Sequence, residues 1–226
     1  MRGTVGELSV DRMIAALLAG ARACGMRAAE VRQRVKVAIE RSQVRRLVLI
    51  EPDEELRQIV LFELREVATL PLSVGILGAL GSGENDFAGE LVLVLPSTAD
   101  GVRARLPEGT PLLVLRIRSA ADSLTRHLPA PKTSLVGIAS RWPKFLDVAR
   151  TMLLAAGVDE EALVVRDARL PDWQAVLETA AAIVCDSWTA QSVATGVRVL
   201  RFPLVADGSL AELREIEEAG VGLADS

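Results

Sequence analysis

Short apolar runs alternate with stretches of helical periodicity from Val44 to the end of the chain. Each run is three to six residues of mostly branched aliphatic side chains, which is typical of buried strands. The predicted strands span residues 46–50, 72–77, 91–95, 112–117, 134–139, 163–165, 182–185 and 197–202. The predicted helices span residues 54–66, 142–156, 173–179, 189–194 and 210–219. Strands that alternate with helices indicate an α/β fold with parallel sheets covered on both faces.

The first 43 residues show helical periodicity alone. We expect a first helix with Ser9 as its cap, an apolar stripe from Met13 to Ala21 and an end at Gly25. A second helix is predicted over 27–41, and the two would form a helical hairpin. Two short amphipathic helices cannot bury both stripes alone, so they must pack on the body or on a second subunit.

Eight strands in the remaining chain can form one sheet or two small ones. The turn-rich stretches 107–111 and 127–131 bracket an expected passage from one lobe to another. We therefore expect two Rossmann-like lobes behind the N-terminal helical hairpin.

Composition and charge narrow the class of protein. The 226 residues are 50% hydrophobic, yet no apolar stretch approaches the roughly 18 residues of a membrane span. Two cysteines far apart favour a reducing compartment over a disulfide framework, so we expect a soluble, cytoplasmic protein without a membrane partner. Residues 1–46 carry a net charge of +6, which leaves −10 for the rest. This basic arm is either close to an anionic partner such as nucleic acid or an ordinary solvated helical face.

Polar residues that directly follow the predicted strands are the candidate binding residues, because ligands of parallel α/β folds bind beyond the carboxyl ends of strands. Several of them precede a helix, where free N–H groups and the helix dipole can hold an anion. The alternative is that the serines, threonines and aspartates are ordinary helix caps. The candidate ligand-binding residues are Glu51, Ser97, Thr98, Ser140, Arg141, Asp186, Ser187 and Thr189.

The sequence contains no recognisable catalytic motif and so gives little support to an enzymatic function. His127 is the single histidine, and it lies beside a proline-rich turn without a nucleophile motif. The glycines of 78–83 do not have the spacing of a dinucleotide-binding loop, and phosphate-loop and zinc-protease motifs do not occur. We expect no cofactor, no metal and no catalysis.

Three segments together resemble the region that follows the winged helix in a subset of GntR-type bacterial transcription regulators. Gly3-Thr4-Val5 is similar to the end of the DNA-binding wing, and 14–41, with Ala28-Ala29-Glu30-Val31, is similar to the helical linker. The body from Val44 resembles a sensing domain of the type 2 periplasmic-binding-protein kind. The chain lacks the roughly seventy residues of a winged helix.

This resemblance implies a linker and dimerisation segment at 1–43, lobe I at 44–116 plus 200–226, and lobe II at 117–199. Crossover strands at 112–117 and 198–204 would join the lobes. It further implies a homodimer formed through the N-terminal helices and a small effector, anionic or neutral, bound between the lobes. DNA would be contacted only through the missing winged helix. Two alternatives remain, a two-lobed enzyme like uroporphyrinogen-III synthases and a dimerisation module that binds no ligand.

Overall fold

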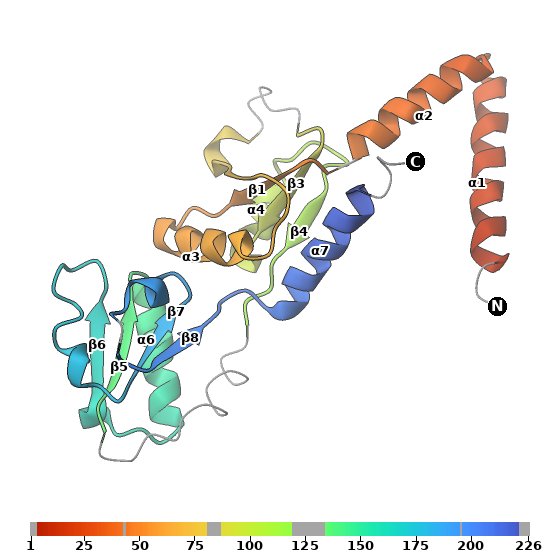
Figure 1. Cartoon of the computed structure of the whole chain (residues 1–226). Coiled ribbons are helices and arrows are strands. Elements are labelled where there is room, and N and C mark those ends of the chain that lie inside the picture. The colour runs from red at the N-terminus through yellow and green to blue at the C-terminus, as the bar shows by residue number, and fades with distance from the viewer. Residues whose placement is uncertain (1–3, 43, 81–86, 119–133, 195, 222–226) are drawn as a thin grey trace. The chain divides into compact units, whose positions relative to one another are not determined.

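The computed structural model describes residues 4–42, 44–80, 87–118, 134–194 and 196–221 (Figure 1). The chain divides into two compact units, residues 1–43 and residues 44–226. His127 and the glycines at 81 and 83, which we considered as chemistry-bearing positions, lie outside the described residues. No helix in the described ranges has the length and apolar character that crossing a bilayer requires.

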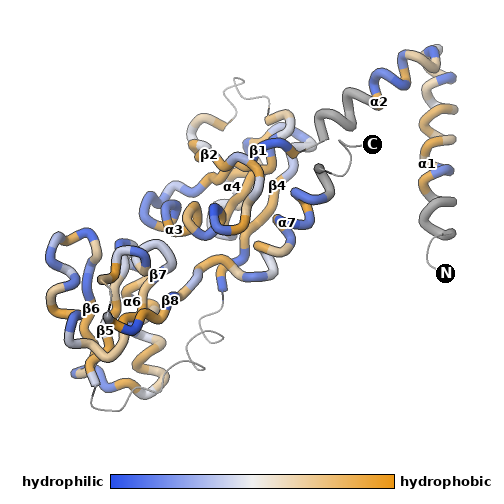
Figure 2. Tube along the Cα trace, viewed as in Figure 1, coloured by the Kyte–Doolittle hydropathy of each residue, from blue (hydrophilic) through white to orange (hydrophobic). Residues whose placement is uncertain are grey.

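The first unit consists of α1 (Thr4–Ala23) and α2 (Ala28–Ser42). Gly25 adopts a positive φ of 73° in the turn that separates them, a conformation that glycine accepts without strain. The prediction that Ser9 caps the first helix is wrong, because the helix already begins at Thr4 and Ser9 lies within it. Hydrophobic residues recur along α1 (Figure 2). Several of them are exposed, among them Met13 at 69% and Leu17 at 52%.

In the second unit, lobe I is built on a four-stranded parallel sheet in the order β2-β1-β3-β4. The strands are β1 (Arg46–Ile50), β2 (Leu72–Val74), β3 (Glu90–Val94) and β4 (Leu112–Val114). β1 pairs along its whole length with β3. In this doubly wound order the connections leave β1 towards opposite sides, so the topological switch point lies between β1 and β3.

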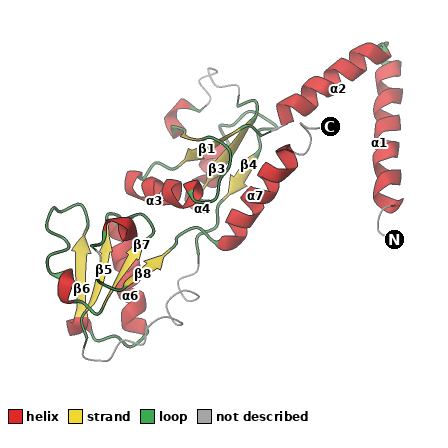
Figure 3. Cartoon of the chain, viewed as in Figure 1, coloured by secondary structure: helices red, strands yellow, loops and turns green. Residues whose placement is uncertain are grey.

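Lobe II repeats this topology in the order β6-β5-β7-β8, again with every pairing parallel (Figure 3). Its strands are β5 (Val136–Ser140), β6 (Leu163–Asp167), β7 (Ala182–Asp186) and β8 (Val199–Phe202). The corresponding switch point lies between β5 and β7. The eight strands therefore form two parallel sheets and not one. Because β8 pairs with β7, the sheet of lobe II extends to Phe202, three residues past the expected boundary at 199.

Four α-helices accompany the sheets in the described residues: α3 (Glu54–Arg65), α4 (Pro96–Arg103), α6 (Pro143–Ala155) and α7 (Asp207–Val221). α3 begins where the Asp53 side chain accepts a hydrogen bond from the N–H of Leu56. α7 completes lobe I, since the Glu217 carboxylate accepts hydrogen bonds from the N–H groups of Thr69 and Leu70.

Two helix predictions in lobe II are wrong. Residues 173–179 form turns that end in the short 3₁₀ helix η3 (Leu177–Thr179), and 189–194 contain η4 (Thr189–Ser192). The spacing of Trp173 and Leu177 suggested a helix, but turns bury both side chains equally well against β5 and β7. Two further 3₁₀ turns are η1 (Leu77–Ala79) and η2 (Glu160–Ala162).

Two chain segments connect the lobes and run antiparallel to each other. Ile117, beyond β4, pairs with Val205, beyond β8. The N–H of Arg118 donates to the carbonyl of Leu204 at 2.7 Å, and the N–H of Ala206 donates to the carbonyl of Arg116 at 2.9 Å. Apolar packing is also continuous through this junction, because one cluster of buried side chains runs from β1 and α3 to β5 and α6. The lobes are therefore joined by backbone pairing and by a shared core.

Candidate functional site

The carboxyl ends of β5 and β7 meet at a buried aspartate. Asp186, the last residue of β7, is fully buried and accepts four hydrogen bonds. Its Oδ1 accepts from the N–H groups of Trp188 and Thr189 at 2.9 and 2.8 Å. Its Oδ2 accepts from the hydroxyls of Ser140 and Thr189 at 2.6 and 2.7 Å. Asp186 therefore holds the loop after β7 and ties it to the end of β5, but it is not a helix cap, since the N-cap residue of η4 is Trp188.

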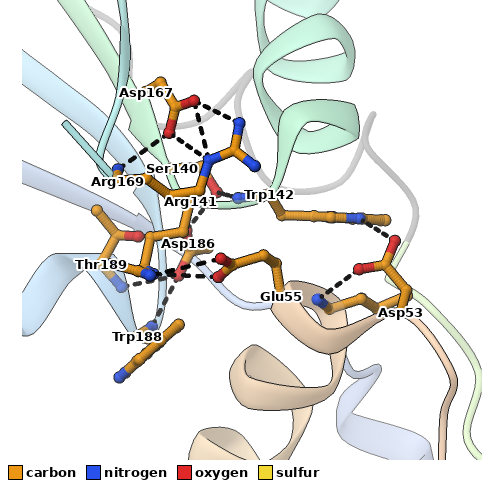
Figure 4. A network of polar contacts seen from close by, with 11 residues as sticks. Asp53, Glu55, Ser140, Arg141, Trp142, Asp167, Arg169, Asp186, Trp188 and Thr189 are labelled. Atoms are coloured by element: carbon orange, nitrogen blue, oxygen red, sulfur yellow. Dashed lines mark hydrogen bonds and ion pairs between the residues drawn. The ribbon is translucent and has the colours of Figure 1, made fainter.

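Arg141 follows β5 and reaches across to lobe I (Figure 4). Its Nε and Nη2 donate to the two carboxylate oxygens of Glu55 in α3, at 3.1 and 3.4 Å. The guanidinium also stands over the ring of Trp188, 5.1 Å from the centroid. Beside it, the indole Nε1 of Trp142 donates to Asp53 at 2.9 Å. We call these five residues the seam, since they join the switch-point loop of lobe II to the start of α3 in lobe I.

A second guanidinium lies near the seam. Arg169 donates to both carboxylate oxygens of Asp167, the last residue of β6. The side-chain hydrogen bond from Arg169 lowers the pKa of Asp167, and the charge of Arg141 adds to this effect. Both arginines are thus neutralised by a carboxylate of the chain itself.

Glu63 is a buried carboxylate at the same lobe junction, in α3. Its Oε1 accepts from the Ser187 hydroxyl at 2.7 Å and from the N–H of Leu204 at 2.8 Å. Its Oε2 accepts from the N–H of Val205 at 2.7 Å. Burial is the largest influence and raises the pKa of Glu63, although these hydrogen bonds oppose the shift. Glu63 therefore fastens α3 both to lobe II and to the returning crossover.

Glu51 follows β1 at the switch point of lobe I and is only 4% exposed. Its Oε1 accepts from the N–H of Asp53 at 2.9 Å, whereas its Oε2 is buried without a hydrogen-bond partner among the described residues. Burial raises the pKa of this carboxyl. Glu51 supports the loop that presents Asp53 to the seam.

Ser97 and Thr98 occupy the first turn of α4 in lobe I. Ser97 is exposed, and the hydroxyl of Thr98 donates to the carbonyl of Leu95 at 3.1 Å. Among the described residues, no hydrogen bond joins either side chain to lobe II. The two candidates of α4 thus lie apart from the others. Five of the candidates do lie at the junction of the lobes. Ser140 and Thr189 are hydrogen-bonded to Asp186 in one network. Arg141 and Ser187 make contacts to lobe I, with Glu55 and Glu63.

Glu55 and Glu63 were missed in the sequence, because only residues that follow strands were considered. A signal for Glu63 does exist there. The buried stripe of α3 includes Leu56, Ile59 and Val60, and the helical spacing continues to Glu63. A carboxylate at a stripe position is expected to be buried and paired, which is how Glu63 is found.

The seam brings one guanidinium, that of Arg141, together with the two carboxylates of Asp53 and Glu55. The guanidinium stands over the aromatic face of Trp188, whose backbone N–H group donates to Asp186. The described residues contain no cluster of three or more histidine, cysteine, aspartate or glutamate side chains suited to a metal ion. Cys185 does not supply a nucleophile, because burial raises the pKa of its thiol to about 12. No family model matches the chain, and no curated protein or solved structure was found to match it.

Proposed function

We propose that this chain is the effector-sensing and dimerisation region of a cytoplasmic, GntR-type transcription regulator, with a body of the type 2 periplasmic-binding-protein kind. The observation that carries the sensing proposal is the ion pair between Arg141 and Glu55 across the seam. Glu55 there has the position that the carboxylate or phosphate of a small effector would take.

Binding at the seam would act as a competition. An anionic effector that pairs with Arg141 displaces Glu55, which frees the start of α3 from lobe II and changes the preferred lobe angle. Arg141 is 38% exposed at its side chain and Glu55 is 20% exposed, so a ligand can reach the pair from solvent. A difference of about 1–3 kcal/mol in affinity between two lobe arrangements is enough for a typical allosteric response.

Dimerisation through the N-terminal helices completes the proposal. The stripe of α1 that includes Met13, Ile14 and Leu17 is exposed, with fractions of 69%, 50% and 52%. Such a stripe on a helix needs a partner, and we propose that a helical hairpin of α1 and α2 pairs with a second copy of the chain. A winged-helix domain outside this chain would contact DNA, and the dimer would transmit the lobe arrangement to it.

If the anion competes with Glu55 for Arg141, substitutions at these two residues should change the affinity for the anion in opposite directions. Purified protein is titrated with a library of metabolite carboxylates and phosphates, and binding is followed by the shift of the unfolding midpoint and by tryptophan fluorescence. Arg141→Ala is expected to abolish the response to the anion that binds, since the guanidinium is removed. Glu55→Gln is expected to tighten binding of the same anion, since the internal competitor is removed. Arg150→Ala, on an exposed face of α6, is the matched control and should leave binding unchanged.

Weaker binding in Glu55→Gln, or full binding in Arg141→Ala, would refute the competition. No shift with any anion would favour the ligand-free dimerisation module. Turnover of a tetrapyrrole precursor by the wild-type chain would instead favour the enzyme alternative.

A further inference from the structure

A cavity of about 210 Å³ lies in the second unit, lined by residues of α6 and of the two crossover segments that join the lobes. Two of the lining side chains, Ile117 and Val148, are large and apolar, yet they are 47% and 51% exposed. Four others are at most 7% exposed and form the floor of the cavity: Phe145, Ala149, Phe202 and Leu204. The cavity therefore extends from side chains that solvent reaches to side chains of the core.

The lining exposes almost no polar surface to this cavity. Arg118 is the single charged residue among the described residues that line it, and its guanidinium pairs with the Asp207 carboxylate. Trp142 also lines the cavity, but its indole N–H donates to Asp53. A charged ligand would lose its hydration here without gaining a partner, which is costly. The lining therefore selects for an uncharged, apolar molecule.

Water is a poor occupant of such a space. A buried water molecule needs roughly two to four polar partners, and this lining does not offer them. Replacement of poorly held water by an apolar group gains affinity. Apolar cavities of about 150 Å³ are large enough to bind benzene, so this one has room for a single six-membered ring with a short alkyl substituent.

The floor of the cavity favours an aromatic ring. Phe145 and Phe202 form an edge-to-face pair, with centroids 5.9 Å apart and an interplanar angle of 70°. Aromatic side chains of this kind attract a further ring at an edge or a face. The thioether of Met152, also in the lining, adapts to irregular shapes.

We propose that this cavity binds a small, uncharged aromatic compound, a single ring with a short alkyl substituent, between α6 and the crossovers. The proposal does not rest on sensing at the seam, because Arg141 is not among the lining residues and such a ligand has no charge with which to displace Glu55. Trp142 connects the two places, since it lines the cavity and donates to Asp53 of lobe I. Occupation of the cavity would thereby influence the contact between the lobes.

The test is a calorimetric titration of the whole chain with benzene, toluene, ethylbenzene and benzoate. Toluene is expected to bind saturably. Affinity should rise about threefold to fourfold for each carbon added from benzene to ethylbenzene, because each added carbon is buried. Benzoate resembles ethylbenzene in size but is charged, so it should bind at least about tenfold more weakly than ethylbenzene.

Two variants place the binding in this cavity. Ala149→Leu fills the floor and should weaken toluene binding about tenfold or more, whereas Ala155→Leu makes the same change at an exposed position of α6 and should leave it intact. Val148→Asp needs no repacking of the core and should also weaken toluene binding about tenfold, since it brings a charge to the cavity. Its matched control is Val176→Asp, at a valine of lobe II that is 46% exposed and outside the lining.

Several outcomes would overturn the proposal. An absence of saturable toluene binding would do so, and would leave the cavity to an apolar side chain of a partner protein. Unchanged affinity in both Ala149→Leu and Val148→Asp would place the ligand elsewhere, and benzoate binding as tight as that of ethylbenzene would contradict the uncharged class. Arg141→Ala should leave toluene binding intact, so the failure of this site and the failure of sensing at the seam are distinguishable.

Discussion

Replacement of Asp186 tests whether the switch-point loop of lobe II depends on one buried carboxylate. Asp186→Ala removes the acceptor for two backbone N–H groups, those of Trp188 and Thr189, and for two hydroxyls. The hydroxyls can rotate towards other acceptors, but the N–H groups are fixed by the turn. Each buried donor left without a partner costs about 1–3 kcal/mol, so we expect a loss of about 3–5 kcal/mol. This is a large share of the roughly 5–15 kcal/mol that stabilises a typical domain.

Asp186→Asn separates the loss of charge from the loss of shape. The amide oxygen can take the place of Oδ1 and keep both N–H donors. The amide nitrogen then faces the hydroxyls of Ser140 and Thr189, which can turn and accept. We expect a cost of about 1–2 kcal/mol for this variant. Asp100→Asn is the control, because the Asp100 side chain is fully exposed and such changes stay within about 0.5 kcal/mol.

Urea unfolding followed by tryptophan fluorescence is the suitable assay. All three tryptophans of the chain, Trp142, Trp173 and Trp188, belong to lobe II, so the signal reports this lobe. The free energy of unfolding of each variant is compared with that of the wild type at equal slope. The reasoning is refuted if Asp186→Ala costs no more than Asp100→Asn, or if the asparagine variant loses as much as the alanine variant.

Three further predictions concern stability and reactivity. Burial raises the pKa of Glu63 above 4.5, the pKa of this carboxyl in the unfolded chain. The carboxyl therefore contributes stability that is present below pH 4.5 and is lost as the pH rises through the pKa of the folded state. Glu63→Gln removes that contribution. The difference in free energy of unfolding between the wild type and this variant, measured in urea, should therefore grow as the pH falls towards 4.5. A difference that shrinks as the pH falls would contradict this. Gly137→Ala should lower the free energy of unfolding by about 1–3 kcal/mol, because the new Cβ would lie 2.8 Å from a methyl of Leu177. Gly101→Ala in α4 meets only the end of the Arg105 side chain at 3.6 Å and should raise the free energy of unfolding by up to about 1 kcal/mol. Urea unfolding of both variants will measure these changes. A thiol reagent should modify the exposed cysteine at 24 in the native protein and the buried one at 185 only after unfolding, as mass spectrometry of the labelled peptides will show.

The central strands could be predicted because the side chains of β1, β3, β5 and β7 are buried on both faces of a parallel sheet. β1 was predicted at its observed bounds, and β7 within one residue, from apolar runs alone. The division into two lobes was expected, but the order of the strands within each sheet could not be predicted, because an apolar run carries no information about its pairing partner. Helical spacing misled at Trp173 and Leu177, where turns bury the same two side chains.

The candidate site was predictable only in part. Asp186 and Ser140 follow from the rule that ligands and caps gather after parallel strands, and the structure shows them bonded to each other. The partner of Arg141 could not be found in this way, since Glu55 lies 86 residues earlier and its contact depends on how the lobes meet.

The chain path has a consequence for biosynthesis. Lobe II lies wholly between β4 and α7, so the ribosome completes it before the last helix of lobe I emerges. Until then the N–H groups of Thr69 and Leu70 lack the Glu217 carboxylate, and the N–H of Arg116 lacks the Ser209 hydroxyl. At about 5–20 residues per second, lobe II has a few seconds to fold while lobe I waits for its closing segment. The order of synthesis thus makes the later lobe in sequence the earlier one to mature, and the arrival of α7 is the step that completes lobe I.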